Sequence, residues 1–211
     1  MDLQTNNVLV SGNIMEEFPI SPKTTRLEVG AKANGNIVVT IPVLISTEQW
    51  ESFKEDYPEK YESVTISGHL DSAYKENSDN IPYVIKTGKN SITCFHHMLD
   101  NYIDESKIQF SGIVKLLEKS DLSKDSELIL RWLTLETTTK YPTVFKAVAL
   151  RKIAPDLNKV KAGTNLWVKA NLVQDKETYQ PYWRLKNFAV LWEPLTKEAC
   201  IHCGPLFYLN K

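Results

Sequence analysis

The sequence has few cysteines and no long hydrophobic run. Three cysteines in 211 residues are too few for a disulfide framework, which favours a reducing environment such as the cytoplasm. No run of 18 apolar residues occurs, so no transmembrane helix is predicted. The first residues, MDLQTNN, are polar and acidic, unlike a secretory signal peptide. We therefore expect a cytoplasmic protein without a membrane partner.

Motifs of common enzyme classes are also missing. There is no Gly-rich phosphate loop, no Gly-x-Ser-x-Gly and no His-Glu-x-x-His. The acidic stretch EDYPEKYE (55–62) is typical of the solvated end of a helix and the loop behind it. A nuclease with catalytic carboxylates and an arginine is the enzymatic alternative, and nothing in the sequence marks one. We expect a protein that is not an enzyme.

Charge is divided unevenly along the chain, although the formal net charge is only −1. Residues 1–106 contain 8 Lys/Arg against 16 Asp/Glu, a net charge of −8. Residues 107–211 contain 17 Lys/Arg against 10 Asp/Glu, a net charge of +7. The second half is therefore the candidate for an anionic partner. Attraction between the two halves is the alternative explanation, and both can hold.

Two sets of strand patterns, one in each half, follow the same order. Apolar alternation bounded by turn residues predicts strands at 8–14, 24–30, 36–45, 64–71 and 82–87, and again at 107–116, 127–136, 143–151, 166–173 and 181–191. VLVSGNI (8–14) and IQFSGIV (108–114) share a Ser-Gly pair, which aligns Gly12 with Gly112. A repeat with a period near 100 residues indicates a domain duplication.

Each set has one short helical pattern between its third and fourth strands. In STEQWESFKEDY (46–57), Ser46 and Gln49 have the spacing of a capping box. APDLNKVKAG (154–163) predicts one or two further turns. This order of elements is that of the OB-fold. The predicted fold is all-β with short helices, as two tandem OB-fold five-stranded Greek-key barrels: OB-fold 1 at 1–90, a linker at 91–106, OB-fold 2 at 107–195 and a C-terminal extension at 196–211. We call the two OB-folds barrel one and barrel two.

The segments NNVLVSGNI, NIVVTIPVLI and VTISGHL resemble the single-stranded-DNA-binding protein family. That family opens with a V-x-L-x-G-x-L strand and has a G-x-L in its fourth strand, matched here by Val8, Val10, Gly12, Ile14, Gly68 and Leu70. The resemblance covers about residues 6–87, and 107–192 by analogy, and it implies binding of single-stranded DNA. Bacterial members usually end in an acidic tail that recruits partners, whereas this sequence ends CGPLFYLNK. The tandem arrangement resembles replication protein A-like, phage or plasmid variants.

Candidate DNA contacts gather in barrel two. Binding a single strand without sequence preference needs outward aromatic rings for base stacking and cations for the phosphates. Residues 140–186 contain ten Lys/Arg against three Asp/Glu. Side chains at the strand positions that alternate with the apolar ones should face outward. These positions and the clustering of cations select nine nucleic-acid-binding candidates: Trp132, Lys146, Arg151, Lys152, Trp167, Lys169, Tyr182, Arg184 and Lys186.

Barrel one has different residues at the matching positions. Trp167 and Lys169 align with Thr65 and Ser67, and Lys146 aligns with Thr40. The loop ENSDNIP (76–82) carries two acidic residues and no cation. We therefore expect barrel one to be a structural partner, an oligomer interface or a protein-docking surface.

Each tryptophan also has a structural alternative. Trp167 could pack under a loop or against barrel one. Trp132 lies in ILRWLTLE, a predicted strand with apolar residues on both faces, so it could face either way. Trp183 falls on the same face of its strand as the apolar Leu185, and Trp50 lies on the apolar face of the predicted helix. Both are therefore expected in the core. Trp192 is expected to cap the barrel or the interface between the domains.

All three cysteines and three of the four histidines lie in CFHH (94–97) and CIHC (200–203). These side chains are ligands of structural zinc, and the candidate metal set is Cys94, His97, Cys200 and Cys203. The spacing is not that of a complete zinc motif, so the expectation is that the protein binds no cofactor, with the cysteines buried as small residues or placed in a turn, and structural zinc is the alternative. A redox Cys-x-x-Cys is disfavoured because no βαβ context is present.

These patterns favour a non-enzymatic protein that binds single-stranded DNA with little sequence preference, mainly through barrel two. The expected setting is replication, recombination or transfer of a bacterial, phage or plasmid genome. A replication or transfer protein is a further candidate partner, an oligomer is compatible with the pattern, and structural RNA binding is a variant of the same hypothesis. The rival hypothesis is a protein-interaction adaptor that docks a basic partner on the acidic first barrel.

Overall fold

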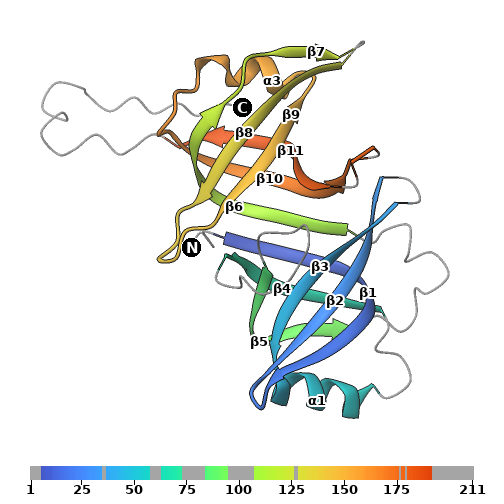
Figure 1. Ribbon diagram of the computed structural model, residues 1–211. Coiled ribbons are helices and arrows are strands. Elements are labelled where there is room, and N and C mark those ends of the chain that lie inside the picture. The colour runs from blue at the N-terminus through green and yellow to red at the C-terminus, as the bar shows by residue number, and fades with distance from the viewer. Residues whose placement is uncertain are drawn as a thin grey trace, which may run out of the picture.

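The computed structural model describes residues 6–34, 37–57, 63–72, 84–94, 107–125, 128–175, 177–178 and 180–191. These residues form two β-barrels, one below the other in Figure 1. Barrel one consists of β1 (Asn6–Ser21), β2 (Thr24–Asn34), β3 (Ile37–Ser46), α1 (Thr47–Asp56), β4 (Ser63–Asp71) and β5 (Val84–Cys94). Barrel two consists of β6 (Lys107–Lys119), β7 (Ser123–Asp125), β8 (Leu128–Thr137), β9 (Val144–Leu150), α3 (Ile153–Asp156), the 3-10 helix η1 (Leu157–Lys159), β10 (Asn165–Gln174) and β11 (Pro181–Val190).

Both barrels have the strand order of an OB-fold. Barrel one closes in the order β1-β2-β3-β5-β4-β1, and barrel two in the order β6-β8-β9-β11-β10-β6. Their third and fifth strands pair in parallel, β3 with β5 and β9 with β11. The predicted fold class is therefore confirmed, with β7 as a short extra strand on β8. Strand β5 runs four residues past the predicted bound at 90, and residues 95–106 lie outside the described ranges.

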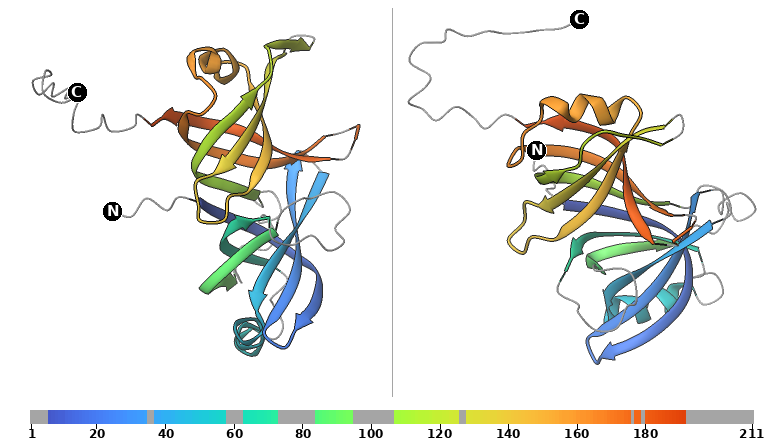
Figure 2. Two further views of the ribbon diagram at one scale, coloured as in Figure 1. Left: turned by 60° about the vertical axis from the view of Figure 1, so that its left-hand side comes forward. Right: turned by 45° about the horizontal axis from the view of Figure 1, so that its top comes forward.

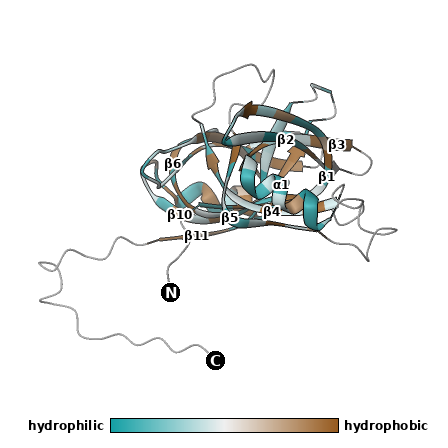
Figure 3. Ribbon diagram, turned by 90° about the horizontal axis from the view of Figure 1, so that it is seen from below, coloured by the Kyte–Doolittle hydropathy of each residue, from teal (hydrophilic) through white to brown (hydrophobic). Residues whose placement is uncertain are grey.

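Apolar side chains from alternate strand positions fill both barrels. In Figure 3 the strands carry both brown and teal segments, as an apolar interior and a polar exterior require. Trp50 and Trp183 are fully buried, which confirms the expected core positions. Helix α1 begins at the predicted cap, because Ser46 Oγ accepts a hydrogen bond of 3.2 Å from the Gln49 N–H. No helix in the described ranges is long and apolar enough to cross a membrane.

The antiparallel pair β1–β6 joins the two barrels into one 11-stranded sheet. Figures 1 and 2 agree that these two strands lie side by side between the barrels. Val8 pairs with Phe110, and both side chains are fully buried. Residues paired directly across strands share one face of the sheet. Both interiors therefore lie on one face of β4-β1-β6-β10, and the outward face of these four strands is called the junction face below.

The alignment of Gly12 with Gly112 is wrong by two residues. Strand β1 has an extra residue, Met15, in its pairing with β2, and β6 has the same irregularity at Leu117 in its pairing with β8. Matching these bulges relates β1 to β6 by 102 residues and places Gly112 at the position of Val10. At this offset Phe110 is the counterpart of Val8. These two residues pair at the centre of the β1–β6 junction, so a residue there faces its own counterpart. The junction is therefore approximately two-fold symmetric, like an interface between identical subunits.

Candidate nucleic-acid interface

An open groove of about 910 Å³ lies on the outward side of barrel two. It is lined in part by β8, β9 and β11. The second and third strands of an OB-fold, here β8 and β9, are the usual nucleic-acid-binding face of this architecture. Three of the nine predicted residues, Trp132, Lys146 and Tyr182, line the groove.

The two aromatic rings in the groove contact each other. Their centroids lie 5.4 Å apart with an interplanar angle of 67°, an edge-to-face arrangement. Trp132 is 42% exposed although it pairs with the buried Val148. Lys146 is paired with Thr134 on β8, and register places it beside Tyr182 on β11. The groove therefore offers an exposed indole, a supporting phenol ring and an ammonium group within one surface.

The phenol of Tyr182 is held in its neutral form. Burial raises the pKa of Tyr182, and the charge of Asp175 acts in the same direction while that of Arg184 opposes it. A neutral phenol is a hydrogen-bond donor that does not repel phosphate.

A second lysine of the groove, Lys119, has a structural role that the sequence pattern did not indicate. Its Nζ donates hydrogen bonds to the carbonyl oxygens of Leu157 (2.8 Å), Asn158 (2.8 Å) and Val160 (2.5 Å). Burial and the charge of Arg131 lower the pKa of Lys119. The ammonium group therefore anchors the end of η1 to β6.

The connection between β10 and β11 forms one wall of the groove. The Asp175 carboxylate accepts hydrogen bonds from the N–H of Glu177 (2.9 Å), the N–H of Thr178 (2.8 Å) and the Thr178 hydroxyl (3.0 Å). The hydrogen bonds from Thr178 and Glu177 lower the pKa of Asp175. This carboxylate is committed to its turn, which stabilises the groove wall.

Two further candidates on β11 differ in their placement. Arg184 pairs with Asn171 on β10 and with Val148 on β9, so it follows Tyr182 on the outward side. Its Nε is buried without a hydrogen-bond partner among the described residues. Lys186 is the extra residue of a register shift between β10 and β11, and its side chain is exposed. Partial burial and the nearby charge of Arg184 lower the pKa of Lys186, so Lys186 stays a candidate beside Arg184.

Arg151 and Lys152 lie where β9 ends and the chain turns into α3. Both side chains are exposed. Arg151 has a φ of 52°, and its N–H donates a 2.7 Å hydrogen bond to the Ile129 carbonyl. The left-handed backbone is therefore tied to β8 at this turn.

Trp167 and Lys169 lie on the junction face and outside the groove. Trp167 is half-buried between Ile113 on β6 and Ala189 on β11. Tyr182 is paired with Val173, six residues further along β10, which corresponds to about 20 Å. The structure thus separates these two candidates from the Trp132–Tyr182 pair.

Hydrogen-bond register also identifies the matching positions in barrel one. Leu44 pairs with Lys86 as Val148 pairs with Arg184. Strand β3 therefore corresponds to β9 at an offset of 104 residues. The counterpart of Lys146 is Pro42, and the predicted match to Thr40 is wrong by two positions.

The same register gives the counterparts of the aromatic pair. Arg26 occupies the position of Trp132, because it pairs with Leu44 on β3. It forms an ion pair with Glu28 and lies over the Phe18 ring, 5.8 Å from its centroid. The counterpart of Tyr182 is Val84, which is buried. At these positions barrel one has an ion pair and an aliphatic side chain in place of two stacking rings.

The predicted zinc set falls largely outside the described residues. Cys94 ends β5 and packs, partly buried, against the core. His97, Cys200 and Cys203 lie outside the described ranges, as does Trp192. Within those ranges no group of three or more His, Cys, Asp or Glu side chains is placed to hold a metal ion.

The strand order and the two barrel closures define the chain as a tandem OB-fold protein. It is similar in structure to the single-stranded DNA binding protein from Thermus aquaticus. The likeness to a deletion mutant of that protein has a TM-score of 0.69 and 15% sequence identity and covers 94% of this chain and 100% of the other. The likeness to the wild-type protein has a TM-score of 0.66 and 15% identity and covers 91% and 95%. No protein-family model and no curated protein matches the chain.

Proposed function

We propose that this protein binds single-stranded DNA, catalyses no reaction and has little sequence preference, with the groove of barrel two as its main site. The observation that carries the proposal is the exposed Trp132 ring, backed by Tyr182 and flanked by Lys146. Base–aromatic stacking contributes about 1–3 kcal/mol per base and tolerates any base. The similar fold of a protein described as a single-stranded DNA binding protein supports the same function.

In the proposed mode of binding, a base stacks on Trp132 while its phosphates contact Lys146 and Arg184. The neutral Tyr182 hydroxyl donates to a phosphate or sugar oxygen. None of these contacts requires a particular base edge, which accounts for the weak sequence preference. The biological role that follows is to protect or present a single strand during replication, recombination or transfer of a bacterial, phage or plasmid genome.

A second candidate function is a protein-interaction adaptor that uses barrel one. The observation in its favour is a group of exposed apolar side chains on that barrel, Met15, Phe18, Ile20 and Val38. Such residues on the more acidic half of the chain would suit a basic partner with apolar anchors.

The experiment is a titration with oligo-dT of about 15 nucleotides, long enough for one OB-fold, followed by tryptophan fluorescence at two salt concentrations. We expect quenching that originates from the exposed Trp132, because Trp50 and Trp183 are buried. Trp167 is half-buried and lies outside the groove, so Trp132→Ala should remove most of the quenching. Affinity should fall as salt rises, since phosphate contacts release counterions. Absence of binding at low salt would contradict the proposal and favour the adaptor. A parallel titration with oligo-U measures the preference between DNA and RNA.

A further inference from the structure

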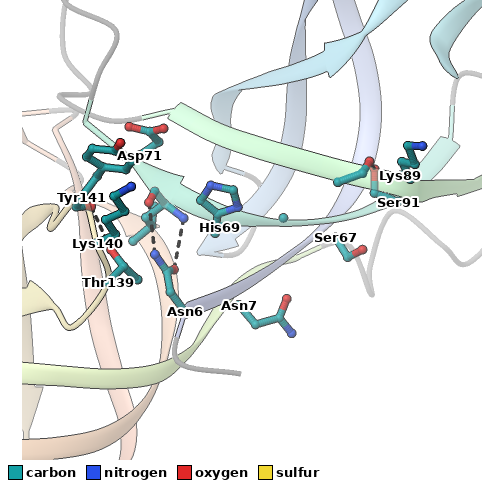
Figure 4. A pocket seen from close by; sticks show the side chains of 13 residues that line it. Asn6, Asn7, Ser67, His69, Asp71, Lys89, Ser91, Thr139, Lys140 and Tyr141 are labelled. Carbon is teal, nitrogen blue, oxygen red and sulfur yellow. Dashed lines mark hydrogen bonds between the residues drawn. The ribbon is translucent and has the colours of Figure 1, made fainter. Parts of the chain in front are cut away.

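A second cavity, of about 590 Å³, lies where barrel one meets the hairpin between β8 and β9. Figure 4 shows side chains from both barrels around it. Barrel one contributes the start of β1, the second half of β4 and the middle of β5, and barrel two contributes Thr139, Lys140 and Tyr141. We call this cavity the inter-barrel pocket.

Tyr141 is an aromatic side chain with no role in a core. It is 69% exposed, and the Lys140 Nζ lies 5.4 Å from its ring centroid. The surrounding hairpin is nevertheless held in place. The N–H of Thr138 donates to the Ile113 carbonyl of β6 at 3.3 Å. The hydroxyl of Thr143 donates to the Leu70 carbonyl of barrel one at 3.4 Å. The ring is therefore presented to the pocket from a backbone tied to both barrels.

A cation lines the pocket from barrel one. Strand β5 is interrupted at Gly88–Ser91, where Asn90 has a φ of 52°. The Gln49 amide of α1, oriented with its nitrogen toward this bulge, donates to the Gly88 carbonyl at 2.9 Å and accepts from the Ser91 N–H at 2.7 Å. The bulge carries the exposed Lys89 into the pocket lining. A helix side chain thus fixes a lysine at this position in an otherwise acidic barrel.

The remaining wall is polar. The Asn6 side chain bonds both backbone groups of Leu70, at 3.1 Å each, and so closes the end of β4. Ser67 and His69 are exposed on β4, and their side chains line the pocket. An aromatic ring, two ammonium groups and small hydrogen-bonding side chains are the elements that recognise a nucleotide.

We propose that the inter-barrel pocket is a second binding site for a nucleotide of the same single strand. The base stacks on Tyr141, and the phosphates contact Lys89 and Lys140. The route from the groove follows the outward side of β9 past Lys146 and Val144, the latter 47% exposed, to the hairpin. This inference rests on the proposed function and extends it, because it brings the strand onto the edge of the acidic barrel.

The test compares two oligo-dT lengths, about 10 nucleotides for the groove alone and about 30 nucleotides for both sites. We expect Tyr141→Ala to weaken binding of the longer oligonucleotide about tenfold and to leave the shorter one within about twofold. Tyr141→Phe, which keeps the stacking ring, should bind both like the unaltered protein. Lys89→Ala should weaken only the longer complex, and Lys23→Ala, an exposed lysine in the β1–β2 turn of the same barrel, should weaken neither. Thermal unfolding of each variant checks that it is folded.

A direct measurement is photo-crosslinking of the longer oligonucleotide substituted with 5-iododeoxyuridine. Crosslinks to the peptide that contains Tyr141, in addition to one that contains Trp132, support the second site. Crosslinks to the Trp132 peptide alone, with equal affinities for Tyr141→Ala and the unaltered protein, overturn the second site and leave the groove intact. Failure of the unaltered protein to bind either oligonucleotide overturns both proposals.

Discussion

Trp132 and Arg26 hold the same position in the two barrels and give those barrels different surfaces. Trp132 leaves an indole exposed beside Tyr182, whereas Arg26 is neutralised by Glu28. Each difference concerns an outward side chain, which contributes little to the core. At the scale of single residues, the chemistry of the surface therefore differs at positions that the fold does not constrain.

Paired substitutions compare the groove with the junction face. Trp132→Ala with Lys146→Ala should weaken oligo-dT binding at least tenfold, because both the stacking ring and a phosphate contact are lost. Trp167→Ala with Lys169→Ala tests the other two predicted residues, for which we expect a smaller loss. Fluorescence anisotropy with a labelled oligonucleotide gives both constants. A larger loss for the second pair would move the main site to the junction face.

Gly12 is expected to tolerate no side chain. A Cβ at this position would lie 2.1 Å from the Gly30 carbonyl oxygen, a backbone atom of β2. Gly12→Ala should lower the free energy of unfolding by about 1–3 kcal/mol or prevent folding, as overpacking does. The matched control is Gly88→Ala, where an added Cβ meets no atom within 4 Å. Urea denaturation followed by circular dichroism measures both.

Bulges decide most differences between the predicted and observed elements. The predicted first strand ended at residue 14, but β1 continues to Ser21 because the extra residue Met15 lets it turn along β2. The last strand of barrel one was predicted to end at 87, and β5 resumes after the Gly88–Ser91 bulge. A bulge shifts the alternation of side chains, so a period-two pattern ends there although the strand does not.

The β10–β11 connection should respond to acid through Asp175. Hydrogen bonds from Thr178 and Glu177 favour its carboxylate in the folded protein, so its folded pKa lies below the unfolded value. Its contribution to stability is therefore present above the unfolded pKa and is lost as the pH falls through the folded pKa. A carboxyl NMR titration should give a midpoint below about 3.9, the ordinary value for aspartate. Thr178→Ala should raise that midpoint, and an unchanged midpoint would contradict the turn as its cause.

At the scale of the whole molecule, two barrels of opposite charge share one sheet. Backbone hydrogen bonds between β1 and β6 fix the placement of the two barrels relative to each other. Attraction between the halves and an anionic partner for barrel two are therefore compatible. The inter-barrel pocket exists only because this pairing brings the β8–β9 hairpin to the end of β4.

Salt dependence should report the number of phosphates contacted. If Lys146, Arg184, Arg151 and Lys152 each neutralise one phosphate, log K should fall against log salt with a slope of roughly −3, at about −0.7 per contact for a single strand. Lys146→Ala should make that slope shallower by about 0.7. Lys124→Ala serves as the control, an exposed lysine on β7. Equal slopes for all three proteins would remove Lys146 from the binding surface.

The sequence by itself determined the two OB-folds, the buried Trp50 and Trp183, the Ser46 cap and the basic character of barrel two. Alternation and turn residues act locally, and burial of apolar side chains leaves little choice of which face turns inward. Only the tertiary structure decided which outward residues are neighbours. Closing a barrel brings Trp132 to Tyr182 and leaves Trp167 on the junction face, because strand register and bulges, which no local pattern encodes, set the rows across a sheet. Tyr141 escaped prediction for the same reason, since the residues that share its pocket belong to a barrel that lies far away in the chain.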